Sequence, residues 1–154
     1  MSVTRQKYYS DLLAVLERNH TEPLTKEKAR VAYSDSNQII DSWSHGTVKI
    51  HSAVKVLLPS RKLAIDLTLK PEKSENSVRE ANEYFELLQK DQGVIEEIIG
   101  EVLDWRCAPT ERQIILNVDA DPNNESDWPR QHELLAARLL AFRIAFSSRI
   151  AQFP

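Results

Sequence analysis

The strongest constraint on the fold is the alternation of apolar and polar residues over residues 47–70. In TVKIHSAVKVL the apolar members of this pattern are Val48, Ile50, Val54 and Val56, and in KLAIDLTLK they are Leu63, Ile65, Leu67 and Leu69. Successive side chains of a strand point to opposite faces of a sheet, so a period of two indicates half-buried strands. The segment LPSR separates the two runs. The sequence therefore predicts an antiparallel hairpin with one buried and one exposed face.

Three other segments show the spacing of amphipathic helices. The first helix is predicted from Thr4 to Arg18. A second is predicted to begin at Ser77-Val78-Arg79-Glu80, where Ser and Glu have capping-box spacing, and to bend or break at Gly93. The last is predicted to begin between Ser126 and Pro129, because proline suits the first turn. Its apolar stripe consists of Trp128, His132, Leu135, Leu139, Phe142, Phe146 and Ile150.

The segment IEEIIGEVLDW, residues 95–105, predicts a helix end followed by a strand. Gly100 stands where a left-handed residue ends a helix, so we expect it to have a positive φ. Leu103, Trp105 and Cys107 share one face of the following strand, and we expect Trp105 to be buried. Glu96 and Glu97 lie off the isoleucine stripe and are predicted to be solvated rather than catalytic.

The remaining elements complete an α+β fold. In RQIILNVD, residues 112–119, Ile114, Leu116 and Val118 alternate as in an inward-facing strand. Residues 20–43 show no clean period, and SDSNQIIDSW within them suggests turns and a short helix. The predicted order is α-β-β-α-β-β-α, with an antiparallel sheet of two hairpins packed against helices. A length of 154 residues fits a single domain, residues 1–154,.

Composition excludes some classes of protein. No apolar run approaches the ~20 residues that span a bilayer, and MSVTRQKYYSD lacks a signal-peptide core, so we expect no membrane partner. The lone cysteine, Cys107, suits a cytoplasmic protein and is interpreted as a small strand hydrophobe,. Charge is unevenly distributed along the chain. Residues 1–70 contain eleven basic residues (Lys or Arg) and seven acidic residues, whereas residues 71–127 contain five basic and fifteen acidic residues. Residues 128–154 contain four basic residues and one acidic residue. Solvated helices explain such unevenness more simply than a polyanion site does.

Two groups of polar residues invite a catalytic or metal-binding interpretation. The segment NVDADPNNESDW carries acids at alternate positions, but the EF-hand glycine and glutamate are replaced by Asn124 and Arg130,. Acids that precede a helix also suit its positive N-terminus. Asp66 and Lys70 resemble part of a metal-dependent nuclease motif, but Thr68 stands where an acid is required. We expect Asp66 to pair across the hairpin with Lys49, His51 or Lys55, and we expect no cofactor or metal.

The exposed hairpin face is the best candidate for a binding surface. Its basic residues are Lys49, His51, Lys55, Lys62 and Lys70, with Arg61 at the turn. A basic sheet face can follow a phosphate backbone. The absence of aromatic residues on this face argues against a domain that stacks single-stranded bases. Edge lysines that discourage aggregation are the alternative explanation.

From Tyr8 to its end, the sequence resembles a prokaryotic family known as domain of unknown function 4268. The matching pieces are the pair Tyr8-Tyr9, residues 43–46 before the hairpin, EYFELLQKDQGVIEEIIGEVLDW (residues 83–105) and DWPRQHELLAARLLAFRIAF (residues 127–146). Members of the family often follow a restriction-endonuclease-like domain. The resemblance implies a role in nucleic-acid processing or defence against foreign DNA, and it supplies no catalytic residues.

We therefore expect a binding or accessory domain rather than an enzyme, acting on nucleic acid through the exposed hairpin face. The first alternative is a degenerate metal-dependent nuclease that uses Asp66. The second is a protein-interaction module that uses the acidic middle helices. The sequence does not specify an oligomeric state.

Overall fold

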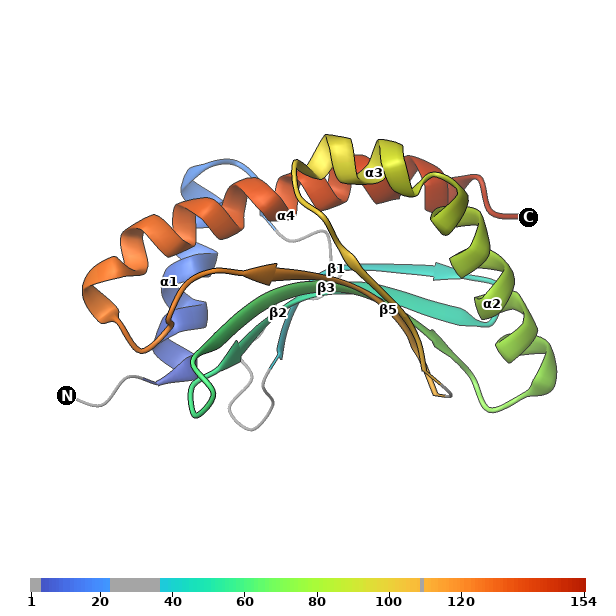
Figure 1. Cartoon of the computed structure of the whole chain (residues 1–154), viewed down its shortest axis with the longest axis horizontal. Helices are drawn as coiled ribbons and strands as arrows, with labels where there is room; N and C mark the ends of the chain where they lie inside the picture. Colours follow the sequence, from blue (N-terminus) through green and yellow to red (C-terminus); the bar gives the residue numbers. More distant parts are fainter. Residues whose placement is uncertain (1–3, 23–36, 109) are drawn as a thin grey trace.

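A five-stranded antiparallel sheet forms one layer of the fold and helices form the other (Figure 1), in a computed structural model that describes residues 4–22, 37–108 and 110–154. The strands are β1 (Asn37–His45), β2 (Val48–Leu57), β3 (Lys62–Pro71), β4 (Asp104–Cys107) and β5 (Arg112–Val118), in the spatial order β1-β2-β3-β5-β4. The helices are α1 (Arg5–Arg18), α2 (Glu75–Lys90), α3 (Gln92–Ile99) and α4 (Trp128–Ala151), preceded by the short 3₁₀ helix η1 (Glu125–Asp127). The α+β class is confirmed. The predicted order is wrong in two places, because it lacked β1 and counted α2 and α3 as one helix.

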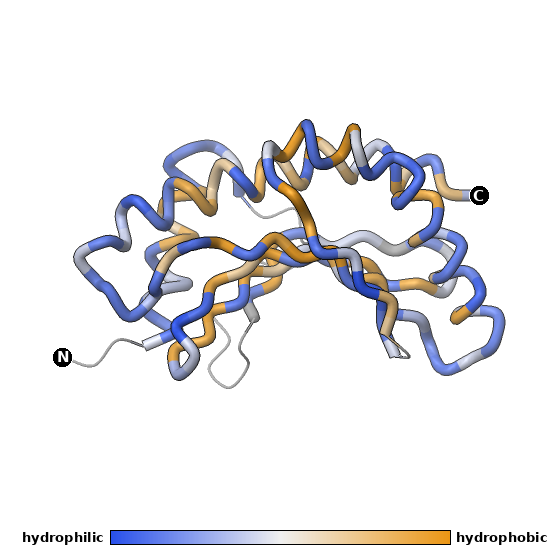
Figure 2. The backbone as a smooth tube through the Cα atoms, in the orientation of Figure 1, coloured by the Kyte–Doolittle hydropathy of each residue, from blue (hydrophilic) through white to orange (hydrophobic). Residues whose placement is uncertain are grey.

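The hairpin of β2 and β3 is confirmed, and it forms the centre of the sheet. Val54 lies opposite Ile65 and Val56 opposite Leu63, so the apolar sets of both strands share one face. We call this the helix face, because the helices cover it. The strands carry much of the hydrophobic sequence, whereas the loops at both ends of the molecule are hydrophilic (Figure 2).

β1 was missed because its pattern is irregular. Its register against β2 shifts between Ile39 and Asp41, and a bulge of this kind interrupts the period of two,. Asp41 is buried despite its charge and accepts bidentate hydrogen bonds from Arg143 of α4, with both N–O distances 3.0 Å. Because polar residues occupy buried positions of β1, its sequence lacks the alternation that predicts a strand. The predicted turns and short helix are wrong over residues 37–43, and residues 23–36 lie outside the described residues.

Two predicted helix boundaries also need correction. α1 ends at Arg18 as predicted, and Thr4 is its N-cap. α2 begins before Ser77, because Ser74 is its N-cap and accepts a hydrogen bond from Ser77 N. Ser77 Oγ instead donates to Thr47 O at 3.0 Å, and Glu80 accepts from Thr47 N at 3.3 Å. The break between α2 and α3 falls at Asp91, whereas Gly93 lies inside α3.

The corner between α3 and β4 has the predicted backbone and a different role for Glu96. Gly100 has φ 83° and ends α3 in the left-handed conformation. Trp105 is half-buried on the helix face, and its Nε1 donates to Glu96 Oε2 at 3.3 Å, while Leu103 N donates to the same oxygen at 2.8 Å. Glu96 therefore joins α3 to β4, while Glu97 is exposed as predicted. Cys107, expected as a packed hydrophobe, is exposed.

The final helix matches the sequence pattern most closely. α4 begins at Trp128 with proline in its first turn, and every residue of the predicted stripe is buried. α4 packs along the helix side of the molecule beside α3 and α1 (Figure 1). The strands bow away from these helices at both ends, so the sheet is curved (Figure 1). No helix of the described residues covers its opposite side. No described helix combines the length and the apolar character needed to cross a membrane.

Candidate functional site

The side of the sheet that faces away from the helices, here called the open face, carries the predicted binding residues. The register places on it Lys49, His51, Ala53 and Lys55 of β2, and Lys62, Ala64, Asp66, Thr68 and Lys70 of β3. Gln113, Ile115 and Asn117 of β5 and Asp104 and Arg106 of β4 continue it. None of these side chains is a phenylalanine, tyrosine or tryptophan. A ligand on this face therefore meets charged, amide and small apolar groups rather than rings.

Both ends of the hairpin carry exposed basic residues. Lys49 lies directly opposite Lys70, and both side chains are exposed. At the other end, Lys62 begins β3 next to Arg61, which has a positive φ of 54° in the turn. Within residues 4–22, 37–108 and 110–154, no carboxylate oxygen lies within 4 Å of the charged nitrogens of these four residues. We call them the four open-face cations.

The centre of the open face is charge-paired and more buried than the sequence suggests. Lys55 Nζ lies 3.1 Å from Asp66 Oδ2, which confirms the predicted cross-strand pairing. Thr68 Oγ1 donates to Asp66 Oδ1 at 3.2 Å. The sequence predicted that this face of the hairpin is exposed, and that prediction is wrong at its centre, because Asp66 and Thr68 are only 1% and 3% exposed. Lys55 thus forms an ion pair with Asp66, whereas the four open-face cations form none with the described carboxylates.

Burial also changes how the central groups titrate. Burial raises the pKa of Asp66, and Lys55, the hydrogen bond from Thr68 and the nearby His51 oppose that rise. Burial lowers the pKa of half-buried His51, against the attraction of Asp66 and Glu111. A carboxylate that is held by its own lysine and threonine is poorly placed to ligate a metal ion. No group of three or more His, Cys, Asp or Glu in the described part of the chain is arranged to hold one.

The acidic loop before α4 forms hydrogen bonds that connect it to the turn between β2 and β3. Asp121 Oδ1 accepts from Asn123 N at 2.9 Å, and Asn123 Nδ2 donates to Leu58 O at 2.8 Å. Leu58 O also accepts from Arg61 N at 3.2 Å. The loop therefore holds the β2–β3 turn, and with it Arg61, in place. Asp127 pairs with Arg130, whose hydrogen bonds lower the pKa of Asp127 to about 2.

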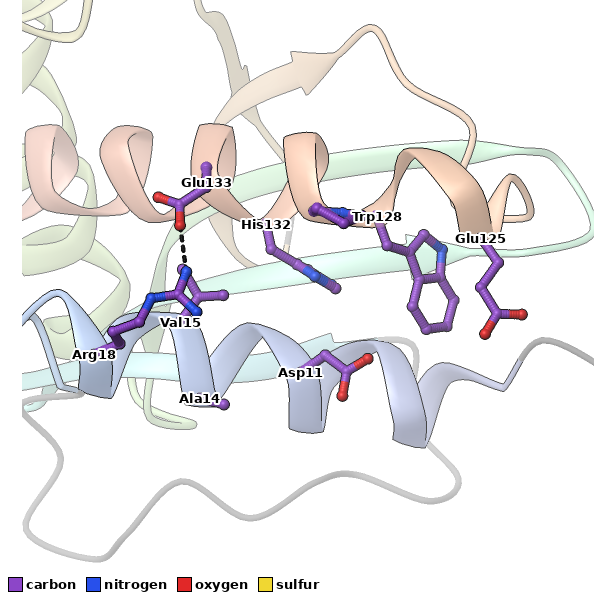
Figure 3. A pocket seen from close by; sticks show the side chains of 9 residues that line it. Asp11, Ala14, Val15, Arg18, Glu125, Trp128, His132 and Glu133 are labelled. Carbon is purple, nitrogen blue, oxygen red and sulfur yellow. Dashed lines mark hydrogen bonds and ion pairs between the residues drawn. The ribbon is translucent and has the colours of Figure 1, made fainter.

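A groove of about 430 Å³ lies between α1 and α4 (Figure 3). Asp11, Ala14, Val15 and Arg18 of α1 line one wall, and Trp128, Pro129, His132 and Glu133 of α4 line the other, with Glu125 at one end. Sequence reasoning assigned His132 to the core stripe, and it is 3% exposed. The pairing of α1 with α4 that creates the groove joins residues more than a hundred positions apart. Nothing in the local pattern signalled it.

The comparisons with known proteins assign a family. The sequence model of the family described as "Domain of unknown function (DUF4268)" matches residues 4–150. The chain belongs to the DUF4268 family. This match confirms the resemblance seen in the sequence and covers every helix and strand of the fold except the last residue of α4, Ala151. Searches of curated proteins and of solved structures found no match.

The four open-face cations and the groove therefore stand as the two candidate sites of this DUF4268 domain. The structure brings Lys49 and Lys70 together and separates them from Arg61 and Lys62 by the length of the hairpin. His51 and Lys55 belong to the paired centre between these ends. The sequence grouped five of these residues by alternation and added Arg61 from its place at the turn. Alternation reports which face a side chain occupies and not whether a neighbour neutralises it.

Proposed function

We propose that this domain binds nucleic acid through phosphate contacts made by the four open-face cations, as an accessory domain without catalytic activity of its own. The observation that carries the proposal is the pairing of Lys49 with Lys70. Like charges directly opposite on a sheet destabilise it, and no described carboxylate lies within 4 Å of either ammonium,. A polyanion that spans the face relieves this repulsion.

The spacing of the cations fits an extended ligand. Lys62 and Lys70 begin and nearly end β3, eight residues apart, or about 26 Å of strand at ~3.3 Å per residue,. That length equals the rise of about eight base pairs. The open face lacks aromatic rings between the two ends, so contacts to the backbone rather than to stacked bases are expected. Binding should accordingly be weak and largely indifferent to sequence.

Fluorescence anisotropy with DNA hairpins tests the proposal. Stems of 5 and 14 base pairs are titrated at several salt concentrations, and only the longer stem reaches both ends of the face. Four phosphate contacts give a slope of log K against log salt of about −3.6, at about −0.9 for each contact. The variant Lys49→Gln/Lys70→Gln should reduce that slope by about 1.8 and should not change the fold, since both residues are exposed,.

The matched control removes two positive charges elsewhere. Arg79 and Lys90 are exposed on α2, so Arg79→Gln/Lys90→Gln has the same net charge as the test variant. This control should retain the wild-type slope. Absence of binding at 20 mM salt, or an equal loss in both variants, would remove the open face from consideration. The acidic exposed positions of α2 and α3 would then be the better surface to probe for a protein partner.

The nuclease alternative is disfavoured by the geometry of Asp66. Its two oxygens already have Lys55 Nζ and Thr68 Oγ1 as neighbours, at 3.1 and 3.2 Å. No magnesium-dependent cleavage of the hairpins is expected during the titrations. Cleavage that disappears in Asp66→Asn would establish the alternative instead.

A further inference from the structure

The groove between α1 and α4 is lined by a buried histidine, His132. His132 projects from α4 toward α1, on the opposite wall from Asp11 (Figure 3). The His132 ring packs against Tyr8 and Trp128, with centroids 4.5 and 5.8 Å away. His132 Nε2 has no hydrogen-bond partner among the described residues. A buried polar atom in this state favours a ligand that satisfies it.

In the neutral ring of His132 the proton lies on Nδ1, so Nε2 is a hydrogen-bond acceptor. Burial lowers the pKa of His132, and the charge of Asp11 and a hydrogen bond with the Tyr8 backbone oppose that effect. Because the hydrogen bond with Tyr8 raises the pKa of His132, the imidazole ring is its donor. Nε2 has no partner among the described residues, so the donating nitrogen is Nδ1. The neutral ring therefore presents the lone pair of Nε2. A group that binds there must bring its own N–H or O–H.

The charges around His132 select a cation. Glu125 pairs with Lys7 at 2.9 Å, and Glu133 pairs with Arg18, so both rim acids are neutralised. Asp11 is half-buried, and no cation of the described residues lies within 4 Å of its carboxylate. The charge of Asp11 helps to raise the pKa of Lys7, but no described cation forms an ion pair with Asp11. The groove thus holds one carboxylate outside an ion pair, opposite a lone-pair acceptor. Both features repel anions and attract a positively charged donor.

Trp128, on the α4 wall of the groove, suits the same class of ligand. Trp128 lies between Glu125 and His132, and Lys7 Nζ stands 5.8 Å from the centroid of its ring. This contact shows that the ring is placed to receive positive charge. Trp128 Nε1 donates to Pro122 O at 2.8 Å, so the indole supplies a surface rather than a donor. The alkyl part of a small cation can lie against it.

We propose that the α1–α4 groove binds a small organic cation with N–H donors, an alkylamine or alkylguanidine. The cation pairs with Asp11, one of its N–H groups donates to His132 Nε2, and its alkyl chain contacts Trp128. This site lies on the helix side of the molecule and is independent of the proposed nucleic-acid surface.

The test is a titration of the whole protein with n-butylguanidinium, followed by amide and side-chain chemical shifts in NMR spectra. A ligand of this size is expected to bind with a Kd on the order of 1 mM. The shifts should centre on the Trp128 indole, the His132 ring and the amides of α1 near Asp11. Asp11→Asn should weaken binding at least fivefold. Glu17→Gln, an equal charge change at an exposed position of α1, should leave it unchanged.

Tetramethylammonium separates the roles of charge and hydrogen bonding, because it carries the charge without an N–H group. It should bind at least fivefold more weakly than n-butylguanidinium. Equal binding of the two cations, an equal effect of Glu17→Gln, or no shift at these residues up to 20 mM would each overturn the proposal. Folding of Asp11→Asn is checked by the dispersion of its own spectrum, and Trp128→Leu provides a second variant that should also weaken binding.

Discussion

Replacement of glycine by alanine is expected to have opposite effects at Gly93, inside α3, and at Gly100, the C-cap of that helix. Gly100 ends the helix with φ 83° and ψ 16°, a conformation that costs a residue with a Cβ about 1–2 kcal/mol,. A Cβ there would also lie 3.1 Å from Arg138 Nη1, which donates to Ile99 O at 2.7 Å. Because this contact disturbs a hydrogen bond as well, Gly100→Ala should destabilise the protein by about 2 kcal/mol.

Gly93 is the matched control within the same helix. It has a negative φ, and a Cβ added to it would meet no heavy atom within 4 Å. Helical glycine is less stable than alanine by about 0.5–1 kcal/mol, so Gly93→Ala should stabilise the protein by that amount. Gly100→Asn adds a further comparison, because asparagine tolerates the left-handed conformation but still carries the Cβ that approaches Arg138.

Urea unfolding followed by tryptophan fluorescence and circular dichroism measures these differences. The two alanine variants should differ in unfolding free energy by about 2.5–3 kcal/mol, or by several degrees in Tm at about 2–4 °C per kcal/mol. Gly100→Asn should fall between Gly100→Ala and wild type. Wild-type stability in Gly100→Ala, or a loss above about 0.5 kcal/mol in Gly93→Ala, would refute the description of this helix end.

Three further predictions concern buried and half-buried polar groups. Glu96→Ala should cost about 1–3 kcal/mol in urea unfolding, because two N–H groups lose their acceptor, whereas Glu97→Ala should stay within about 0.5 kcal/mol of wild type,. Arg143→Met should cost about 3–5 kcal/mol in the same assay, because it removes the bidentate partner of the buried Asp41 carboxylate; a loss below 1 kcal/mol would show that the pair is unimportant,. His132 has a lowered pKa in the fold, so the unfolded chain binds more protons below about pH 6.5 and stability should fall as pH decreases from there,. His132→Phe should flatten that decline in thermal melts between pH 7 and 5.5, and an unchanged slope would contradict the assignment.

Elements with strong periodicity were predictable from the sequence, and irregular ones were not. The hairpin of β2 and β3 and the stripe of α4 follow simple periods, and both match the structure. β1 did not, because its bulge shifts the pattern and Asp41 is buried by virtue of Arg143, a partner 102 residues away. The start of α2 was misplaced for a similar reason. Ser77 has the spacing of a cap, but Ser74 performs that role, while Ser77 binds the β1–β2 turn.

The candidate surfaces were predictable only to the level of a sheet face. Alternation placed Lys49, Lys55, Lys62 and Lys70 on one side of the sheet, and the register confirms that placement. Lys55 is neutralised by Asp66, which lies diagonally across the hairpin from it. From alternation alone, Lys49, His51 and Lys55 were all possible partners of the Asp66 carboxylate. The α1–α4 groove depends on the packing of two helices at opposite ends of the chain. Such packing has no local signature in one sequence.

The pairing at the centre of the open face also decides how that face must be tested. Lys55→Glu would put a second carboxylate beside Asp66, which is 1% exposed, so loss of binding in that variant would be confounded with loss of the fold,. Lys49 and Lys70 do not neutralise a buried carboxylate, because their side chains are exposed and no described carboxylate lies within 4 Å of their charged nitrogens. A binding defect in Lys49→Gln/Lys70→Gln that leaves the urea midpoint unchanged therefore reports on the surface itself. We expect the four open-face cations to contribute little to folding, so such a defect would separate the proposed contact with phosphates from any effect on stability.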